Sequence, residues 1–363
     1  MTKVIPFNDL ARHNEAFIND LKMAVGRVID SGWFVLGEEG KAFESSFAEY
    51  CGAARCVGVG NGTDALELAL RALECGPGDD VLTVANAGMY SAAAITATGA
   101  RPVFIDVDPV RLTMDPRSLA AARTTRTKAV IVTHLYGRLA DMDALLAAAD
   151  GAPVIEDCAQ AHGAIRHGRK AGTFGALGCF SFFPTKNLGA LGDGGAVVTN
   201  DGALAERVEQ LRQYGWSRKY QADLFGGRNS RLDEMQAAVL RLKLPSLDGW
   251  NSRRRAIAQR YQQALPPGAM PPLGEDDVAH LAVVQVDDRS RLQDMLTQAN
   301  IIWSVHYPIA DHRQQAMAHL APFASLPVIE AAQDRILTLP CFPEMTDREV
   351  ERVVAVLTEF CNS

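Results

Sequence analysis

The stretch "GCFSFFPTKNLGALGDGGAVVTND", residues 178–201, places a single lysine, Lys186, between a run of aromatic residues and a run of glycine and small apolar residues. A lysine that only keeps a surface soluble usually has charged neighbours, but the next charged residue after this one is Asp193. A buried amine is costly unless it is paired, neutral or used covalently, and a snorkelling surface lysine is the alternative. We therefore predict a buried strand that is followed by a functional lysine.

Strand-like runs alternate with helical patterns over about residues 55–200. The runs are continuously apolar rather than alternating, which is typical of parallel strands that helices cover on both faces. A sheet of this kind binds its ligands beyond the carboxyl ends of the strands. The sequence therefore predicts an α/β fold with candidate site residues directly after "RCVGVG", "VLTVAN", "RPVFIDVD", "AVIVTHLYG", "APVI" and "CFSFF".

The pattern changes near residue 228, where a long helical stretch begins that is interrupted near Pro245. A strand-like segment, "HLAVVQVDD", and a last helical stretch, "TDREVERVVAVLTEF", follow it. A chain of 363 residues is long enough for two hydrophobic cores. We expect a large domain over residues 1–250 and a smaller C-terminal domain over residues 251–363.

Composition and charge argue against several classes of partner. The formal net charge is -7 and there is no long Lys/Arg-rich run, which disfavours binding to nucleic acid. Neither a signal-peptide pattern nor a membrane-spanning apolar run is found, and the seven scattered cysteines fit reduced thiols better than metal ligands. We expect a cytoplasmic protein with no nucleic-acid, membrane or metal partner.

Two further strand ends carry polar groups. Gly62 and Thr63 follow the first run at a helix start, where free backbone N–H groups bind anions, although helix capping by Asn61 or Thr63 is the alternative. Asp157 and Gln160 follow "APVI", where a buried acid needs a cationic or donor partner, although capping of the next helix explains an acid there equally well. These groups and Lys186 are expected at one edge of the sheet.

Together these groups match the needs of pyridoxal 5'-phosphate. A lysine whose surroundings lower its pKa forms a Schiff base with the cofactor aldehyde. An acid such as Asp157 can keep the pyridine nitrogen protonated, which makes the ring an electron sink, and a Gly/Thr helix start can hold the phosphate. We therefore predict pyridoxal phosphate bound covalently to Lys186.

Several blocks of the sequence resemble the DegT/DnrJ/StrS family of sugar aminotransferases. The blocks are "EDCAQAHGA" (156–164), the stretch of residues 178–201, "GGRNSRLDEMQAAVL" (226–240) and "HYPI" (306–309). The likeness runs nearly end to end, from "IPFNDL" to "ILTLPCFPEMTDREVERVV". The resemblance implies the aspartate-aminotransferase fold (fold type I) and a homodimer with active sites at the subunit interface.

The resemblance also implies a role for each matching residue. Lys186 would carry the cofactor and serve as acid and base, Asp157 would pair with the pyridine nitrogen, and Gln160 would contact the phenolic oxygen. The remaining implied contacts are Gly62, Thr63 and Ser181 to the phosphate, Asn229 to the phosphate from the partner subunit, and His306, Tyr307 and Tyr220 on the substrate side.

One position departs from the family pattern. The family usually has an aromatic residue that stacks on the cofactor ring, and counting back from Gly99 and Ala100 this position falls on Gly88, in "VANAGMYSAAA". Tyr90, two residues further on, is the candidate to supply the ring if the local backbone shifts. Otherwise the stacking is weaker or comes from elsewhere.

The resemblance implies a reaction in two halves. An amino acid, in the family usually L-glutamate, would convert the cofactor into pyridoxamine phosphate, which would then aminate a nucleotide-linked keto-deoxysugar. The blocks "NGTDALELAL" and "LDGWNSRRRAIAQRY" look more like members that act at C3 of dTDP-3-keto-6-deoxyhexoses. The candidates to meet the sugar's pyrophosphate are Arg228, Arg231 and the cluster Arg253–Arg255, for which a solvated basic face is an equal alternative.

Three other functions compete with this interpretation. The same chemistry could act on a 4-keto sugar or a cyclitol ketone. A dehydratase of the family usually has histidine in place of the lysine, so Lys186 argues against it. A non-catalytic regulator that keeps the fold is the third, and the presence of Lys186, Asp157 and Gln160 disfavours it.

Overall fold

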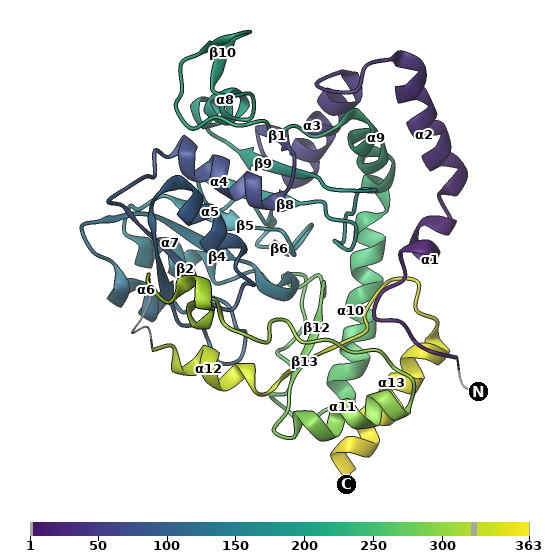
Figure 1. Ribbon diagram of the computed structural model, residues 1–363. Coiled ribbons are helices and arrows are strands. Elements are labelled where there is room, and N and C mark those ends of the chain that lie inside the picture. Colours follow the sequence, from purple (N-terminus) through teal and green to yellow (C-terminus); the bar gives the residue numbers. More distant parts are fainter. Residues whose placement is uncertain (1–2, 321–324, 363) are drawn as a thin grey trace.

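The computed structural model describes residues 3–320 and 325–362, and a seven-stranded sheet forms its centre (Figure 1). Across the sheet the strands lie in the order β1-β9-β8-β5-β4-β2-β3. Strand β9 runs antiparallel to both neighbours, and the other pairs are parallel, which confirms the predicted α/β class. The bounds are Arg55–Val59 (β1), Asp80–Val84 (β2), Arg101–Ile105 (β3), Thr127–Thr133 (β4), Val154–Asp157 (β5), Leu177–Ser181 (β8) and Gly195–Thr199 (β9).

Helices cover both faces of this sheet, as the continuous apolar runs predict. Alternate residues of one strand enter different cores: Val130 and Val132 of β4 lie in one, and Ala129 and Ile131 lie in the other. The first core includes α3 (Glu38–Cys51), α6 (Pro116–Ala122), α7 (Met142–Ala149) and α9 (Glu234–Lys243). The second includes α4 (Gly62–Ala72), α5 (Tyr90–Thr98) and α8 (Gly202–Leu211).

A third large core is formed mainly by the C-terminal part of the chain. It joins α10 (Leu247–Ala264), β12 (Ala282–Gln285), α11 (Arg289–Gln298), β13 (Ile336–Leu339) and α13 (Asp347–Asn362). Helix α10 connects two cores, because Leu247 packs in the first and Ile257 and Tyr261 pack in the third. The domain boundary between residues 250 and 251 stays a prediction.

Shorter elements complete the fold. The hairpin of β10 (Trp216–Arg218) and β11 (Gln221–Ala222) stands out at the top of Figure 1, away from the sheet. No helix in the described ranges is both long enough and apolar enough to span a membrane. The remaining elements are α1 (Leu10–Glu15), α2 (Ile18–Ser31), β6 (Ile165–Arg166), β7 (Arg169–Lys170), α12 (Pro327–Gln333) and the 3₁₀ turns Leu135–Gly137, Leu244–Ser246, Asp311–Arg313 and Gln315–Met317.

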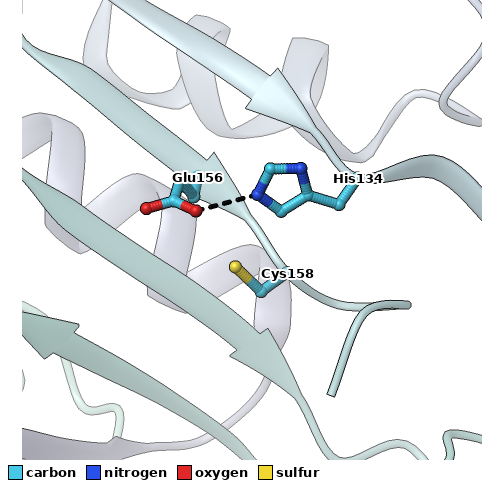
Figure 2. Close-up of side chains that lie close together, drawn as sticks. All are labelled: His134, Glu156 and Cys158. Atoms are coloured by element: carbon cyan, nitrogen blue, oxygen red, sulfur yellow. Dashed lines mark hydrogen bonds and ion pairs between the residues drawn. The ribbon is translucent and has the colours of Figure 1, made fainter. Parts of the chain in front are cut away.

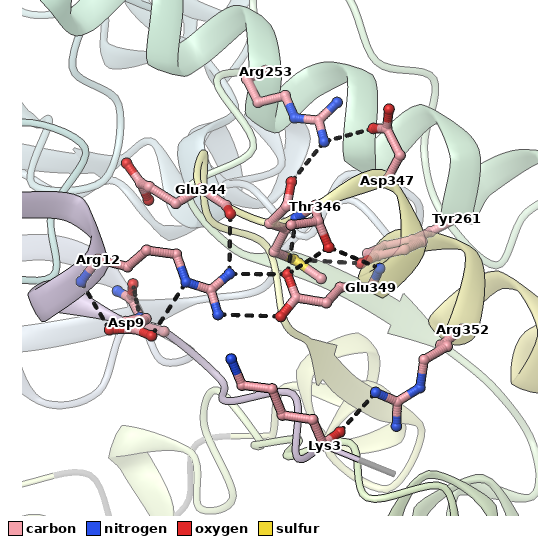
Figure 3. A network of polar contacts seen from close by, with 12 residues as sticks. Lys3, Asp9, Arg12, Arg253, Tyr261, Glu344, Thr346, Asp347, Glu349 and Arg352 are labelled. Carbon is pink, nitrogen blue, oxygen red and sulfur yellow. Dashed lines mark hydrogen bonds and ion pairs between the residues drawn. The ribbon is translucent and has the colours of Figure 1, made fainter. Parts of the chain in front are cut away.

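The N-terminal segment is fastened to the C-terminal part of the chain (Figure 3). Ile5 forms a parallel bridge with Ile301. Arg12 donates to the two carboxylate oxygens of Glu349 at 2.9 and 3.1 Å and to the carbonyl of Glu344 at 3.0 Å. These contacts position residues 7–8, which lie between them and line a cavity described below.

Candidate active site

A cavity of about 290 Å³ lies at the carboxyl ends of the central strands, and we call it the strand-end cavity. Parallel strands end at the same edge of a sheet, so residues that are far apart in the sequence meet there. The pairing of Asp157 with Thr133 on one side and Cys179 on the other fixes the middle of this edge. Seven predicted site residues line the cavity: Gly62, Thr63, Tyr90, Asp157, Gln160, Ser181 and Lys186.

The start of α4 lies against the end of β8. Asn61 caps the helix, since its side chain accepts a hydrogen bond from the N–H of Asp64 at 2.8 Å. Gly62 approaches Ser181 so closely that a Cβ on Gly62 would lie 2.6 Å from the Cβ and 3.2 Å from the Oγ of Ser181. The glycine therefore keeps open a helix N-terminus beside the hydroxyls of Thr63 and Ser181, an arrangement that suits a phosphate.

Lys186 follows β8 in a tight turn, where its N–H donates to the carbonyl of Phe183 at 2.8 Å. Its side chain lines the strand-end cavity and is only partly exposed. Burial lowers the pKa of Lys186 from 10.5 to about 8, and the nearby charge of Asp157 opposes this in part. The amine therefore reaches its neutral form at a much lower pH than an ordinary lysine, as a nucleophile or base requires.

Asp157 ends β5 and is 5% exposed. It accepts hydrogen bonds from the N–H of Ala159 at 3.1 Å and from the hydroxyl of Thr133 at 3.4 Å. Burial raises the pKa of Asp157 despite these bonds and the charge of Lys186. It forms no ion pair with any described residue, so its carboxylate suits a cationic N–H donor in the cavity. A protonated pyridine nitrogen is such a donor, and the residues of the cavity therefore fit pyridoxal phosphate.

Gln160 is held by two tyrosines, Tyr307 and Tyr136, and Tyr136 was not among the residues predicted from the sequence. Its Oε1 accepts from the N–H of Tyr136 at 2.6 Å, and its Nε2 donates to the hydroxyl of Tyr307 at 3.2 Å. The hydroxyl of Tyr136 donates to the carbonyl of His306 at 2.5 Å. Tyr136 lies near the end of the run "AVIVTHLYG", three residues after the last residue of β4, so the rule that selected Asp157 could also have selected it.

A second cluster consists of His134, Glu156 and Cys158, the last two being the chain neighbours of Asp157 (Figure 2). The carboxylate of Glu156 accepts from three backbone N–H groups in residues 172–175 at 2.7–2.9 Å and contacts Nε2 of His134 at 2.9 Å. Nδ1 of His134 accepts from the N–H of Ala140 at 3.2 Å, so its Nε2 carries the proton. His134, Glu156 and Cys158 are close enough to share a metal ion, but these internal hydrogen bonds use both ring nitrogens and both carboxylate oxygens. We assign the cluster to structural support.

A neighbouring cavity of about 270 Å³ shares four lining residues with the strand-end cavity, and we call it the histidine cavity after His280 and His306. His306 and Tyr307, for which the family resemblance implies a place on the substrate side, line it together with Lys186. Burial and the charge of Lys186 lower the pKa of His306 to about 4, so the ring is neutral at neutral pH. His280 had no sequence signal, because it precedes a strand instead of following one.

The structure supplies an aromatic ring at the position where the sequence has Gly88. A Cβ on Gly88 would lie 2.9 Å from two ring atoms of Tyr307, and Gly88 has a φ of +76°, so both space and backbone favour glycine. Tyr90 lies next to this ring, with 6.3 Å between the two ring centroids, and it lines both cavities. Which of the two rings contacts the cofactor stays a prediction.

Four predicted site residues lie outside both cavities. Asn229 is exposed, and Tyr220 is 79% exposed in the turn of the projecting hairpin. Arg228 forms ion pairs with two residues of α4, Asp64 at 3.3 Å and Glu67. The lining of the two cavities also lacks Arg231. Their predicted contacts with cofactor and substrate stay predictions.

The basic cluster at residues 253–255 divides between two surroundings. Arg254 lines the histidine cavity. Arg253 instead bonds to the carbonyl of Met345 at 2.7 Å and to Asp347 at 2.8 Å, on the side that Figure 3 shows. Arg253 and Arg254 therefore lie on different sides of α10, and the cluster does not form one surface of a single subunit that could bind a pyrophosphate.

Comparison with known proteins agrees with this geometry. The chain is 46% identical over 363 residues to dTDP-3-amino-3,6-dideoxy-alpha-D-galactopyranose transaminase of Aneurinibacillus thermoaerophilus, and the alignment covers 98% of this chain and 99% of the relative. The crystal structure of DesV from S. venezuelae in complex with a ketimine intermediate superposes with a TM-score of 0.95 at 43% identity, over 100% of both chains.

A second solved structure contains the cofactor in its amino form. NtdA from Bacillus subtilis with bound pyridoxamine phosphate has a TM-score of 0.94 at 29% identity, and the match covers 100% of this chain and 86% of NtdA. Residues 16–358 match the DegT/DnrJ/EryC1/StrS aminotransferase family. The chain has the predicted aspartate-aminotransferase fold and belongs to this family, and it is a pyridoxal-phosphate-dependent aminotransferase.

Proposed function

We propose that the protein transfers the amino group of L-glutamate to a nucleotide-linked keto-deoxysugar, at C3 of a dTDP-3-keto-6-deoxyhexose. The observation that carries the proposal is that Lys186, with a pKa of about 8, shares one cavity with the unpaired buried carboxylate of Asp157 and an anion-binding helix start. The dTDP-3-amino sugar in the name of the Aneurinibacillus relative supports the choice of acceptor.

Each residue of the strand-end cavity has a task in this reaction. Pyridoxal phosphate supplies an electron sink when it is bound. The neutral amine of Lys186 takes the proton from the α-carbon of the amino donor and later returns a proton to the amine-bearing carbon of the sugar. Asp157 keeps the ring nitrogen protonated, and Gln160 contacts the phenolic oxygen. Gly62, Thr63 and Ser181 hold the phosphate.

The histidine cavity suits the sugar. His306 is neutral and its Nδ1 contacts the hydroxyl of Thr338 at 2.9 Å, which fixes the ring orientation. A neutral imidazole and the hydroxyl of Tyr307 are suitable partners for uncharged hydroxyl and keto groups of a sugar. Lys186, His306 and Tyr307 line the same cavity, which supports a position of the keto group of the sugar close to Lys186.

We further propose a homodimer whose subunits share their active sites. Large apolar side chains that are exposed in the single chain support a second copy as the partner, among them Trp33 at 62% and Phe225 at 100% exposure. The exposed Asn229 and Tyr220 are then free to reach the cavities of the partner subunit, Asn229 to the phosphate and Tyr220 to the substrate. Arg231 is likewise proposed to reach the sugar's pyrophosphate in the partner subunit. Arg228 is a weaker candidate for the same role, because it forms ion pairs with Asp64 and Glu67 on α4 of its own chain.

The proposal is tested by assembling the complete reaction. The purified holoenzyme is incubated with L-glutamate and dTDP-3-keto-6-deoxyhexose, and the product is examined by mass spectrometry and NMR for an amine at C3. The matched acceptor is the 4-keto isomer, and Lys186→Ala is the inactive control. Amination only of the 4-keto sugar or of a cyclitol ketone would refute the C3 assignment, and no amination of any ketone would favour the regulator.

A further inference from the structure

The histidine cavity contains a buried arginine that the reaction described above does not use. Arg254, on α10, is 5% exposed and lines the cavity together with Lys186. Its Nη1 donates to the carbonyls of Cys341 and, at 3.4 Å, His280, but its buried Nε has no hydrogen-bond partner among the residues that the structure describes. A guanidinium in this state is costly to bury unless a ligand completes its hydrogen bonds.

The charged side chains that line the histidine cavity are all basic. None of the described residues that line the histidine cavity is acidic, and two of them, Lys186 and Arg254, are basic. Glu344 is the carboxylate whose charge acts on Arg254, but it makes no ion pair with it and bonds instead to Nδ1 of His13 at 2.8 Å. The cavity therefore suits an anion that arrives with the substrate.

We propose that Arg254 binds a carboxylate of the amino-acid donor. This inference rests on the proposed function and adds the residue that recognises the donor. An amino acid carries its α-carboxylate on the same carbon as the amine that reacts beside Lys186, so the carboxylate enters the cavity that Lys186 and Arg254 share. A carboxylate accepts two parallel hydrogen bonds from a guanidinium, and the Nε of Arg254 has no such acceptor among the described residues.

The sugar's pyrophosphate is a weaker candidate for Arg254. It carries a nucleoside, and a cavity of about 270 Å³ that also holds the sugar has no room for that group beside a residue that is 5% exposed. The phosphates are therefore expected at the mouth of the cavity. The two anions belong to different half-reactions, so they can be separated by experiment.

The test measures each half-reaction of the holoenzyme separately. Arg254→Gln is expected to raise the L-glutamate concentration that half-saturates the first half-reaction by about 100-fold, since charged hydrogen bonds to the donor are lost. The maximal rate is expected to change much less than this concentration. In the second half-reaction, the half-saturating concentration of the keto sugar should stay within about threefold of the wild-type value. The matched control is Arg260→Gln, because Arg260 is an exposed arginine of the same helix.

A binding measurement gives a second, activity-independent readout. Glutarate has the two carboxylates of glutamate without its amine, and glutaramide is its neutral counterpart. Glutarate, but not glutaramide, should raise the melting temperature of the wild-type holoenzyme, and Arg254→Gln should abolish this rise. Arg254→Lys keeps the positive charge but lacks the two parallel N–H donors of a guanidinium, so it should lose most of the rise in melting temperature that glutarate causes. It replaces Arg254→Gln in the test if that variant does not fold.

The outcomes separate the two proposals. If wild type reacts with L-glutamate and Arg254→Gln binds it equally well, or if only the sugar half-reaction is impaired, the assignment of Arg254 is wrong. If glutarate stabilises wild type no more than glutaramide does, the assignment is also wrong. A wild type that is stabilised by glutarate through Arg254 but does not react with L-glutamate would contradict the proposed donor and leave Arg254 supported.

Discussion

Replacing Lys186 by methionine should stabilise the protein when the cofactor has been removed. The side chain of Lys186 is mostly buried, with some exposure to the strand-end cavity, and burial lowers its pKa from 10.5 to about 8. Each pKa unit corresponds to about 1.4 kcal/mol, so holding this lysine protonated in the folded state costs about 3 kcal/mol at pH 7. Methionine has a similar length and carries no charge, so Lys186→Met removes that cost.

The sign of the pH dependence follows from the direction of the pKa change. Between about pH 8 and 10.5 the unfolded chain still binds the proton that the folded chain has released. The free energy of unfolding of the apoprotein therefore rises with pH across this window, and below the window the cost of Lys186 stays at its full size and does not change with pH. The advantage of Lys186→Met should be largest at pH 7 and should disappear as the pH approaches 10.5.

Denaturant unfolding of the apoproteins between pH 7 and pH 10 measures this difference. All variants are compared at one protein concentration, because a dimer would make the apparent stability depend on it. Lys22→Met is the matched control, since Lys22 is exposed on α2. The reasoning fails if Lys186→Met is no more stable than wild type at pH 7, or if its advantage does not decline with rising pH.

Three further predictions concern the cofactor and the dimer. Asp157→Asn should retain pyridoxal phosphate but lose about 100-fold or more in turnover, because it no longer keeps the ring nitrogen charged; an unchanged rate would contradict that role. Gly62→Ala should weaken cofactor binding by about tenfold or more in an absorbance titration, since its Cβ would lie 2.6 Å from Ser181; wild-type affinity would show that the phosphate lies elsewhere. Mixing inactive Lys186→Ala and Asn229→Ala subunits should restore activity, because a shared site puts both lesions in one site of the heterodimer; no recovery would place Asn229 outside the partner's site.

The part of the site that follows strands was accessible from the sequence. Gly62, Asp157 and Lys186 each follow a continuous apolar run, and parallel strands must end at the same edge of a sheet. Their convergence in one cavity is therefore a consequence of the α/β class. The sequence also indicated the caps and the glycine at the start of α4, since these depend on neighbouring residues.

Contacts between distant segments were not accessible in this way. The ring of Tyr307 fills the space beside Gly88, although 218 residues separate the two in the sequence. Arg254 was one of three adjacent arginines, and only the packing of α10 against the C-terminal core distinguishes it as the buried one. Local sequence does not determine which face of a helix meets a cavity when the partner segment lies in another part of the chain.

The most direct test of the central claim is to locate the cofactor on the chain. The holoenzyme is treated with borohydride, which fixes pyridoxal phosphate on the lysine that carries it, and the digested peptides are mapped by mass spectrometry. We predict one modified peptide, from residues 178–201, with the phosphopyridoxyl group on Lys186, and no such peptide after prior reaction with L-glutamate. Modification of another lysine, such as the buried Lys243, or no modification of a protein loaded with pyridoxal phosphate, would contradict the account.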